Sequence, residues 1–196
     1  MELIKMSDQE LIREFLKGNQ KGIEVLIHRH KEKVYTYILI IVKNQVLAED
    51  IFQDTFVKVV QSLNRGKYSD SGKFLSWVIR IAHNLIIDHF RKEKLNNEVS
   101  GDTYELFALN SRKNSIGTVE DELVYNQILN DVRSLINELP EEQKEVILLR
   151  HYGELSFKEI AEQTGVSINT ALGRMRYALI NMRKLIGEKN LSLTLQ

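Results

Sequence analysis

The sequence predicts an all-α protein of two small helical domains joined by a flexible linker, the second domain carrying a helix-turn-helix. Apolar residues recur at helical spacing through most of the 196 residues. Proline occurs once and glycine ten times, which suits helices better than a turn-rich β protein. The helical period is interrupted at residues 96–120, which are rich in Asn, Ser, Gly and Asp. We therefore expect domains at residues 1–95 and 121–196, with 96–120 as the linker.

Composition narrows the class of protein. The chain has no cysteine, which excludes disulfides and thiolate metal sites and suits a reducing cytoplasm. Its apolar runs are too short to span a bilayer, and no targeting segment is expected. The net charge is zero but unevenly spread, with 16 Lys and Arg against 12 Asp and Glu in residues 1–95, 3 against 8 in residues 121–155, and 6 against 3 in residues 156–196. We expect a cytoplasmic protein, monomeric when free, with two basic surfaces and a separate surface for a protein partner.

Four helices are expected in the first domain, at residues 7–17, 20–42, 47–63 and 73–94, each with apolar residues at helical spacing. Ser7 or Asp8 is a suitable N-cap for the first. A turn-forming loop rich in Asn, Gly and Ser separates the last two helices. The expected buried stripes of these two helices are Ala48, Phe52, Phe56, Val59 and Leu63, and Phe74, Val78, Ile81 and Leu85.

The outer face of the helix at 47–63 carries Asp50, Gln53, Asp54 and Val57. Two like charges four residues apart repel on an isolated helix. An exposed valine among acid and amide groups is a surface that a basic partner helix would complement. The alternative, equally open from the residues, is a pair of solvated acids. No third or fourth oxygen ligand is close in the sequence, so no metal site is predicted here.

The helix at 73–94 places Arg80, His83, Asn84 and Arg91 opposite its expected core, with Trp77 at the boundary. Basic groups beside an indole and an amide suit phosphates and unstacked bases, the requirements of single-strand binding. The alternative is that Trp77 belongs to the core and the basic groups are only solvated.

The second domain contains the strongest local signal. Ser156 and Glu159 form a capping-box pattern at the start of a short helix, Gly165 suits a tight turn, and Ser167 can cap a longer helix. This succession predicts a helix-turn-helix. The inner stripe of the longer helix is Ala171, Met175, Ala178, Met182 and Leu185. The opposite face carries Asn169, Gly173, Arg176, Ile180, Arg183 and Lys184, with Arg174 at the flank.

That outer face suits a major groove, because Asn can bind adenine, Arg can bind guanine, and Gly permits close approach. An ordinary helical hairpin with a solvated basic face is the alternative. Before residue 156, a helix is expected at 121–138, and Pro140 followed by two glutamates can begin another.

Three stretches in this order resemble the sigma-70 family, within it the short extracytoplasmic-function (ECF) sigma factors. They are AEDIFQDTF at residues 48–56, FLSWVIRIAHNLIIDHFRK at 74–92 and LPEEQKEVILLRHYGELSFKEIA at 139–161. The resemblance implies core RNA polymerase and promoter DNA as partners, an anti-sigma factor as a regulator, and no cofactor, metal or catalytic activity.

The resemblance also implies roles for the surfaces. Polymerase docking, on a coiled coil of the largest catalytic subunits, falls on Asp50, Gln53, Asp54 and Val57. Recognition and melting of the minus-ten element fall on Lys67, Tyr68, Ser69, Lys73, Trp77, Arg80, Asn84 and Arg91. Binding of the minus-thirty-five element falls on Ser167, Ile168, Asn169, Leu172, Gly173, Arg174 and Arg176. Many relatives carry a valine, a basic and a hydroxyl residue where Ala171, Leu172 and Gly173 stand, so no relative's base preference is carried over.

Two alternatives remain from the sequence. A stand-alone helix-turn-helix regulator would use residues 1–95 for sensing or dimerisation and would bind an operator without polymerase. A regulatory decoy would bind polymerase or another partner and open no promoter. No phosphate-binding loop, nucleotide fingerprint or nucleophile elbow supports an enzyme.

Overall fold

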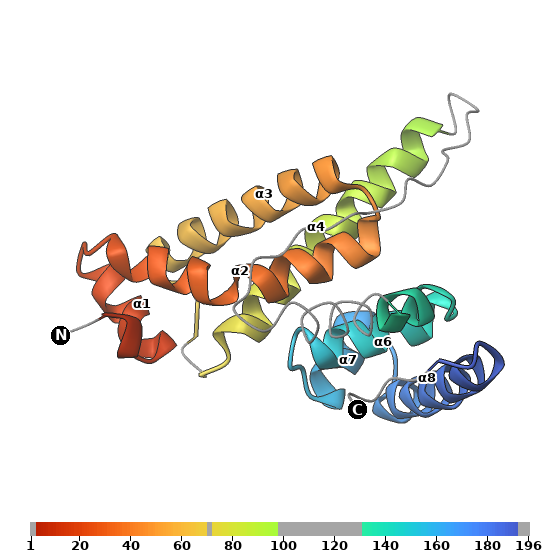
Figure 1. The fold of residues 1–196 in the computed structure, drawn as a ribbon. Helices are drawn as coiled ribbons and strands as arrows, with labels where there is room; N and C mark the ends of the chain where they lie inside the picture. Colours follow the sequence, from red (N-terminus) through yellow and green to blue (C-terminus); the bar gives the residue numbers. More distant parts are fainter. Residues whose placement is uncertain (1–2, 70–71, 98–130, 192–196) are drawn as a thin grey trace, which may run out of the picture. The chain divides into compact units, whose positions relative to one another are not determined.

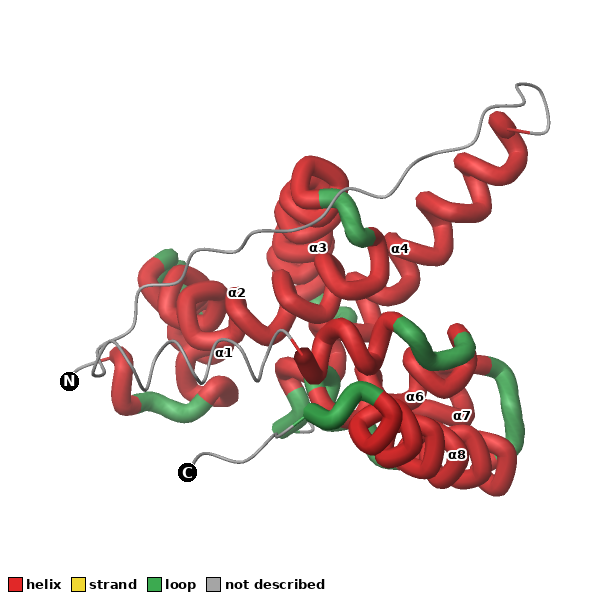
Figure 2. Tube along the Cα trace, turned by 45° about the vertical axis from the view of Figure 1, so that its right-hand side comes forward, coloured by secondary structure: helices red, strands yellow, loops and turns green. Residues whose placement is uncertain are grey.

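The computed structural model describes residues 3–69, 72–97 and 131–191. Its chain divides into two compact units, the first formed by Met1–Ala108 with Tyr152–Glu154 and the second by Leu109–His151 with Leu155–Gln196. All regular elements within the described ranges are helices, so the all-α prediction is confirmed (Figure 2). Most of the expected linker, and residues 121–130 of the helix expected at 121–138, lie outside those ranges.

The first unit is a helical bundle. Its elements are η1 (Leu3–Lys5), α1 (Asp8–Leu16), α2 (Lys21–Val42), α3 (Gln45–Asn64) and α4 (Phe74–Asn97). Helices α2, α3 and α4 each pack against the other two, and α1 and η1 pack on α2 (Figure 1). Of the two N-caps that the sequence allows, Ser7 caps α1, and it does so through a reciprocal pair with Glu10. Helix α4 continues to Asn97, past the expected boundary at residue 95.

The core of this unit differs in part from the expected stripes. On α3, Phe52 is only half-buried, and Ile51 and Thr55 are buried beside the expected residues. On α4, Ile81 and Leu85 are half-buried, and the core positions are taken by Phe74, Leu75, Val78, Ile79, Ala82 and Ile86. Because α4 packs against both α2 and α3, it buries a wider face than one stripe.

His83 is the clearest correction to the sequence prediction. It was expected on the basic outer face, but its residue surface is only 5% exposed. Its Nδ1 lies 2.8 Å from the Tyr37 hydroxyl of α2. Burial lowers the pKa of His83 below its ordinary value of 6.5. His83 therefore belongs to the core.

The second unit contains the predicted helix-turn-helix. Residues 131–137 are helical, and α6 (Glu141–His151), α7 (Phe157–Thr164) and α8 (Ile168–Glu188) pack against one another. Ser156 and Glu159 form the capping box of α7. Gly165 ends α7 with φ 68°, a left-handed conformation that glycine adopts without steric cost. Ser167 caps α8 by accepting a hydrogen bond from the Thr170 N–H.

Within the described residues, none of the helices is long and apolar enough to cross a membrane.

Candidate functional site

The acidic face of α3 lies on the solvent side of the first unit. Asp50, Gln53, Asp54 and Val57 are all exposed, as predicted, while Ala48, Phe56, Val59 and Leu63 hold the opposite side of the helix in the core. Val57 is 53% exposed. Packing within the unit therefore leaves two carboxylates and an apolar side chain available to a partner.

A cluster of aromatic rings lies where the loop after α3 joins α4. The Tyr68 and Trp77 ring centroids are 4.6 Å apart, and Phe74 lies 5.9 Å from Trp77 and 6.0 Å from Tyr68. The sequence left open whether Trp77 is a core residue or is exposed for stacking, and the structure shows it half-buried. The indole packs on its own domain and keeps part of its surface at the solvent boundary.

Polar groups occupy the loop before this aromatic cluster and continue along α4. Lys67, Ser69 and Lys73 of the loop are exposed, while Asp70 and Ser71 lie outside the described residues. Along α4, Asn84 and Arg91 are exposed and Arg80 is half-buried. An Arg91 guanidinium nitrogen lies 3.7 Å from an Asp88 carboxylate oxygen, and a surface pair of this kind holds a side chain only weakly. The loop and α4 together carry cations, an amide and a partly exposed indole.

The outer face of α8 is the third surface. Ser167, Ile168, Asn169, Leu172 and Arg176 are exposed, whereas Ala171 and Ala178 of the inner stripe are fully buried. A Cβ at Gly173 would meet nothing within 4 Å, so a ligand can approach the helix backbone closely there. The predicted division of α8 into an inner and an outer face is therefore observed, although Met175, Met182 and Leu185 are only half-buried.

Arg174 differs from the other residues predicted to bind the minus-thirty-five element. It is half-buried, and its charge acts on Glu145 of α6. Burial raises the pKa of Glu145, and the nearby Arg174 guanidinium opposes but does not cancel that rise. Arg174 therefore interacts with the packed side of its own unit, and Arg176 is the arginine directed to solvent.

No group of three or more His, Cys, Asp or Glu side chains that could hold a metal ion is found among the described residues.

Comparison with known proteins identifies the family of this chain. The family model for Sigma-70 region 2 matches residues 26–95, and the model for Sigma-70, region 4 matches residues 129–176. The chain is 30% identical over 186 residues to the ECF RNA polymerase sigma factor SigW of Bacillus subtilis, covering 92% of this chain and 97% of that protein. It belongs to the ECF sigma factors of the sigma-70 family, and it is an RNA polymerase sigma factor.

Other relatives agree with this assignment. The sigma-H factor of Pseudomonas aeruginosa is 24% identical over 176 residues, covering 88% of this sigma factor and 90% of its own length. Among solved structures, the sigma factor RpoE in complex with the anti-sigma factor NepR from Bartonella quintana has a TM-score of 0.66 at 19% identity, covering 85% of this chain and 98% of that one. CnrH in complex with the cytosolic domain of CnrY has a TM-score of 0.60 at 22% identity, covering 92% and 97%. At these identities the solved structures show a shared fold.

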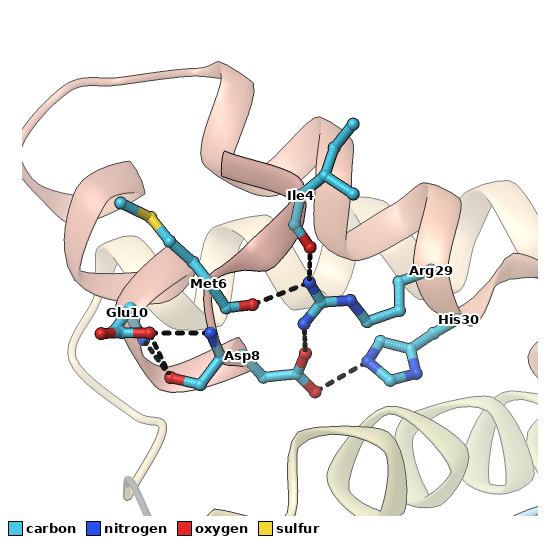
Figure 3. Close-up of polar contacts among 7 residues, drawn as sticks. Ile4, Met6, Asp8, Glu10, Arg29 and His30 are labelled. Carbon is cyan, nitrogen blue, oxygen red and sulfur yellow. Dashed lines mark hydrogen bonds and ion pairs between the residues drawn. The ribbon is translucent and has the colours of Figure 1, made fainter. Parts of the chain in front are cut away.

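One polar cluster of the sigma factor escaped the sequence analysis. The Arg29 guanidinium donates to the Asp8 carboxylate at 2.5 Å and to the carbonyl oxygens of Ile4 and Met6 at 3.1 and 2.8 Å (Figure 3). His30 Nε2 lies 2.7 Å from the other Asp8 oxygen. Because Asp8 lies more than 20 positions from Arg29 and His30, no helical spacing connects them. The only local signal in the sequence was the possible N-cap at Ser7 or Asp8.

Proposed function

We propose that this sigma factor divides promoter recognition between its two units and gains affinity by engaging both on one polymerase. Region 2 and region 4 models match in that order on one chain, and each match contains an exposed face with the chemistry that its role requires. This coincidence is the observation that carries the proposal. Two modest contacts on one scaffold are strengthened by effective concentration.

Polymerase docking is assigned to the α3 face of Asp50, Gln53, Asp54 and Val57. Two carboxylates four residues apart repel each other on an isolated helix and are favourable against a basic coiled coil. The exposed valine adds apolar area to be buried on contact.

Minus-ten recognition and melting are assigned to the loop and the outer face of α4. Lys67, Lys73 and Arg91 supply charge for phosphates. Tyr68 and Trp77 supply ring surface, on which each captured base contributes about 1–3 kcal/mol toward strand opening. Ser69, Arg80 and Asn84 complete the surface with hydrogen-bonding groups.

Binding of the minus-thirty-five element is assigned to α8 in the major groove, with Asn169 and Arg176 as the side chains best suited to base edges. Ile168 and Leu172 supply apolar contacts, Ser167 fixes the helix start, and Gly173 allows close approach. Elements about 20 base pairs apart lie roughly 70 Å from each other at ~3.4 Å per pair. A fully extended segment of the length of residues 96–120 could span about 85 Å.

The proposal also covers how the sigma factor is regulated and where in the cell it acts. Two structural neighbours are complexes with an anti-sigma factor or a cytosolic partner domain, which supports control of this chain by an anti-sigma factor. We place the protein in the cytoplasm, where its polymerase is, as a free monomer that performs no catalytic step itself. The domain limits we propose are those expected from the sequence, residues 1–95, 96–120 and 121–196, with the first domain extended by helix α4 to Asn97.

Run-off transcription tests the proposal. Purified core polymerase is supplied with genomic fragments from the same organism, with and without this protein. New discrete transcripts that depend on the protein support a promoter-specific sigma factor and deliver its promoter sequences. Polymerase binding without transcripts would favour the decoy, and duplex binding without polymerase would favour a stand-alone regulator.

A further inference from the structure

The N-terminal segment, residues 3–16, lies outside both family-model matches, yet it is tightly held on the first unit. Arg29 of α2 binds it at three points, the carbonyls of Ile4 and Met6 and the carboxylate of Asp8 (Figure 3). The Asp8 side chain is only 25% exposed. Hydrogen bonds between charged groups are among the stronger ones in proteins, so these contacts fix the start of α1 in position.

From this fixed point, two contacts reach the loop and helix assigned to the minus-ten element. On α1, the Gln9 Nε2 lies 3.3 Å from where a Cβ of Gly72 would stand. On α2, the His30 ring, hydrogen-bonded to Asp8, lies 5.6 Å from the ring of Phe74. Gly72 is near the end of the loop, and Phe74 is the first residue of α4. The N-terminal segment therefore lies beside Gly72 through Gln9, and it reaches Phe74 through His30 of α2, the hydrogen-bond partner of Asp8.

Phe74 in turn packs near the two rings proposed to bind bases, Tyr68 and Trp77. Phe74 lies 5.9 Å from Trp77 and 6.0 Å from Tyr68. Gly72 has φ +72°, a conformation that L side chains rarely adopt and that glycine adopts without steric cost. Packed rings transmit position, because close-packed groups do not deform continuously.

We propose that the N-terminal segment is a brace for the minus-ten surface, with Gln9 and the Asp8–His30 pair as positioning residues that hold Gly72 and Phe74 so that Lys73, Tyr68 and Trp77 are pre-organised for the promoter strand. The proposal rests on the assignment of that surface in the proposed function. Holding a loop in its binding geometry before contact reduces the ordering cost of binding. The brace strengthens DNA capture without touching DNA, and it leaves the α3 face unchanged.

Two variants and a matched control test the brace. Gln9→Ala removes the side chain that lies beside Gly72, and Asp8→Asn removes the charge that joins Arg29 to His30. Gln20→Ala is the control, since Gln20 is an exposed glutamine at the start of α2 and makes no side-chain capping bond. Trp77 is the single tryptophan of the chain, so acrylamide quenching of the free protein reports directly on the aromatic cluster. Circular dichroism checks that each variant is folded.

The second readout is promoter opening by reconstituted holoenzyme, measured by permanganate reactivity on a promoter fragment recovered by run-off transcription. We expect both brace variants to quench more readily at Trp77 and to weaken opening about three- to tenfold, the effect of losing one or two positioning contacts. The brace variants should bind polymerase with wild-type affinity. The Gln20→Ala variant should show wild-type quenching and wild-type promoter opening. Unchanged quenching, or changed quenching with wild-type opening, would overturn the brace.

Lys73→Ala separates this inference from the function on which it rests. If Lys73→Ala reduces opening and the brace variants do not, the brace is wrong and the minus-ten surface stands. If Lys73→Ala and the brace variants all open the promoter normally, the minus-ten assignment fails, and the brace fails with it.

Discussion

The Tyr37 hydroxyl lies 2.8 Å from His83 Nδ1 inside the helical bundle, joining α2 to α4. Both residues are buried, and burial lowers the pKa of His83 below 6.5. The neutral imidazole is therefore the form that the folded state favours. The helical period placed His83 on the face proposed to bind DNA, but it is instead part of the core that supports that face.

The lowered pKa of His83 makes the stability of the first unit depend on pH. The unfolded chain binds a proton near pH 6.5 and the folded chain only at lower pH, so stability should fall as pH drops below 6.5 toward the folded pKa. Imidazole NMR titration of the folded protein should place the His83 pKa below 6.5. A value at or above 6.5 would contradict the neutral, desolvated assignment.

Gly22 allows α1 and α2 to approach each other closely. A Cβ at position 22 would lie 2.5 Å from the Leu11 carbonyl oxygen and 3.0 Å from the Phe15 nitrogen, and backbone atoms cannot move away cheaply. Gly22→Ala should therefore destabilise the first unit by about 1–3 kcal/mol in denaturant unfolding. Gly187→Ala in α8, where a Cβ would meet nothing within 4 Å, is the control and should be neutral or slightly stabilising. Equal effects at the two sites would refute the close packing.

Local signals predicted much of this fold. The capping box at Ser156 and Glu159, the left-handed turn at Gly165 and the cap at Ser167 all involve residues within a few positions of one another, and all are observed. The predicted exposure of the outer face of α3 is also observed, because Phe56, Val59 and Leu63 hold the other side of that helix in the core.

Contacts between helices explain what the sequence did not predict. His83 looks polar in sequence, and only Tyr37, 46 positions earlier, shows how the core accommodates it. Helical position placed Arg174 at the flank of the helix, but only its neighbour Glu145 shows that it acts on another helix of its unit. The Asp8, Arg29 and His30 cluster likewise depends on how α1 packs on α2.

Asp54→Arg should abolish association with core polymerase, because it places a cation in the face proposed to meet a basic partner. Helical content should remain unchanged, since Asp54 is exposed. Glu24→Arg, a charge reversal at an exposed position of α2, is the control. Fluorescence-detected titration of core polymerase measures both variants. Wild-type affinity of Asp54→Arg would remove this face from the docking surface.

Arg176→Ala and Arg174→Ala should fail in different ways. Arg176 is exposed, so its removal should weaken binding of holoenzyme to the upstream element by about 1–3 kcal/mol and leave stability unchanged. Arg174 is half-buried and acts on Glu145, so its removal should lower the thermal stability of the second unit. Mobility shifts measure DNA binding by holoenzyme with each variant, and thermal unfolding measures the stability of each variant. Loss of DNA binding only in the Arg174 variant would reverse the two roles.

Gly173→Ala tests close approach at the outer face of α8. The position is helical and open, so alanine should stabilise α8 by about 0.5–1 kcal/mol. The added methyl group should nevertheless weaken duplex binding, because it lies where the groove is proposed to meet the backbone. Opposite changes in thermal stability and upstream-element affinity are the expected pattern. Affinity that stays constant or rises with stability would show that DNA does not approach Gly173.

A footprint of holoenzyme on a promoter recovered by run-off transcription tests the central claim most directly. Two protected segments about 20 base pairs apart are expected, with permanganate-reactive thymines in the downstream one. Arg176→Ala should lose the upstream protection, Lys73→Ala should lose the reactive thymines, and free protein should protect neither segment. Full protection by the protein without polymerase, or a single protected segment affected equally by both variants, would contradict the division of promoter recognition between the two units.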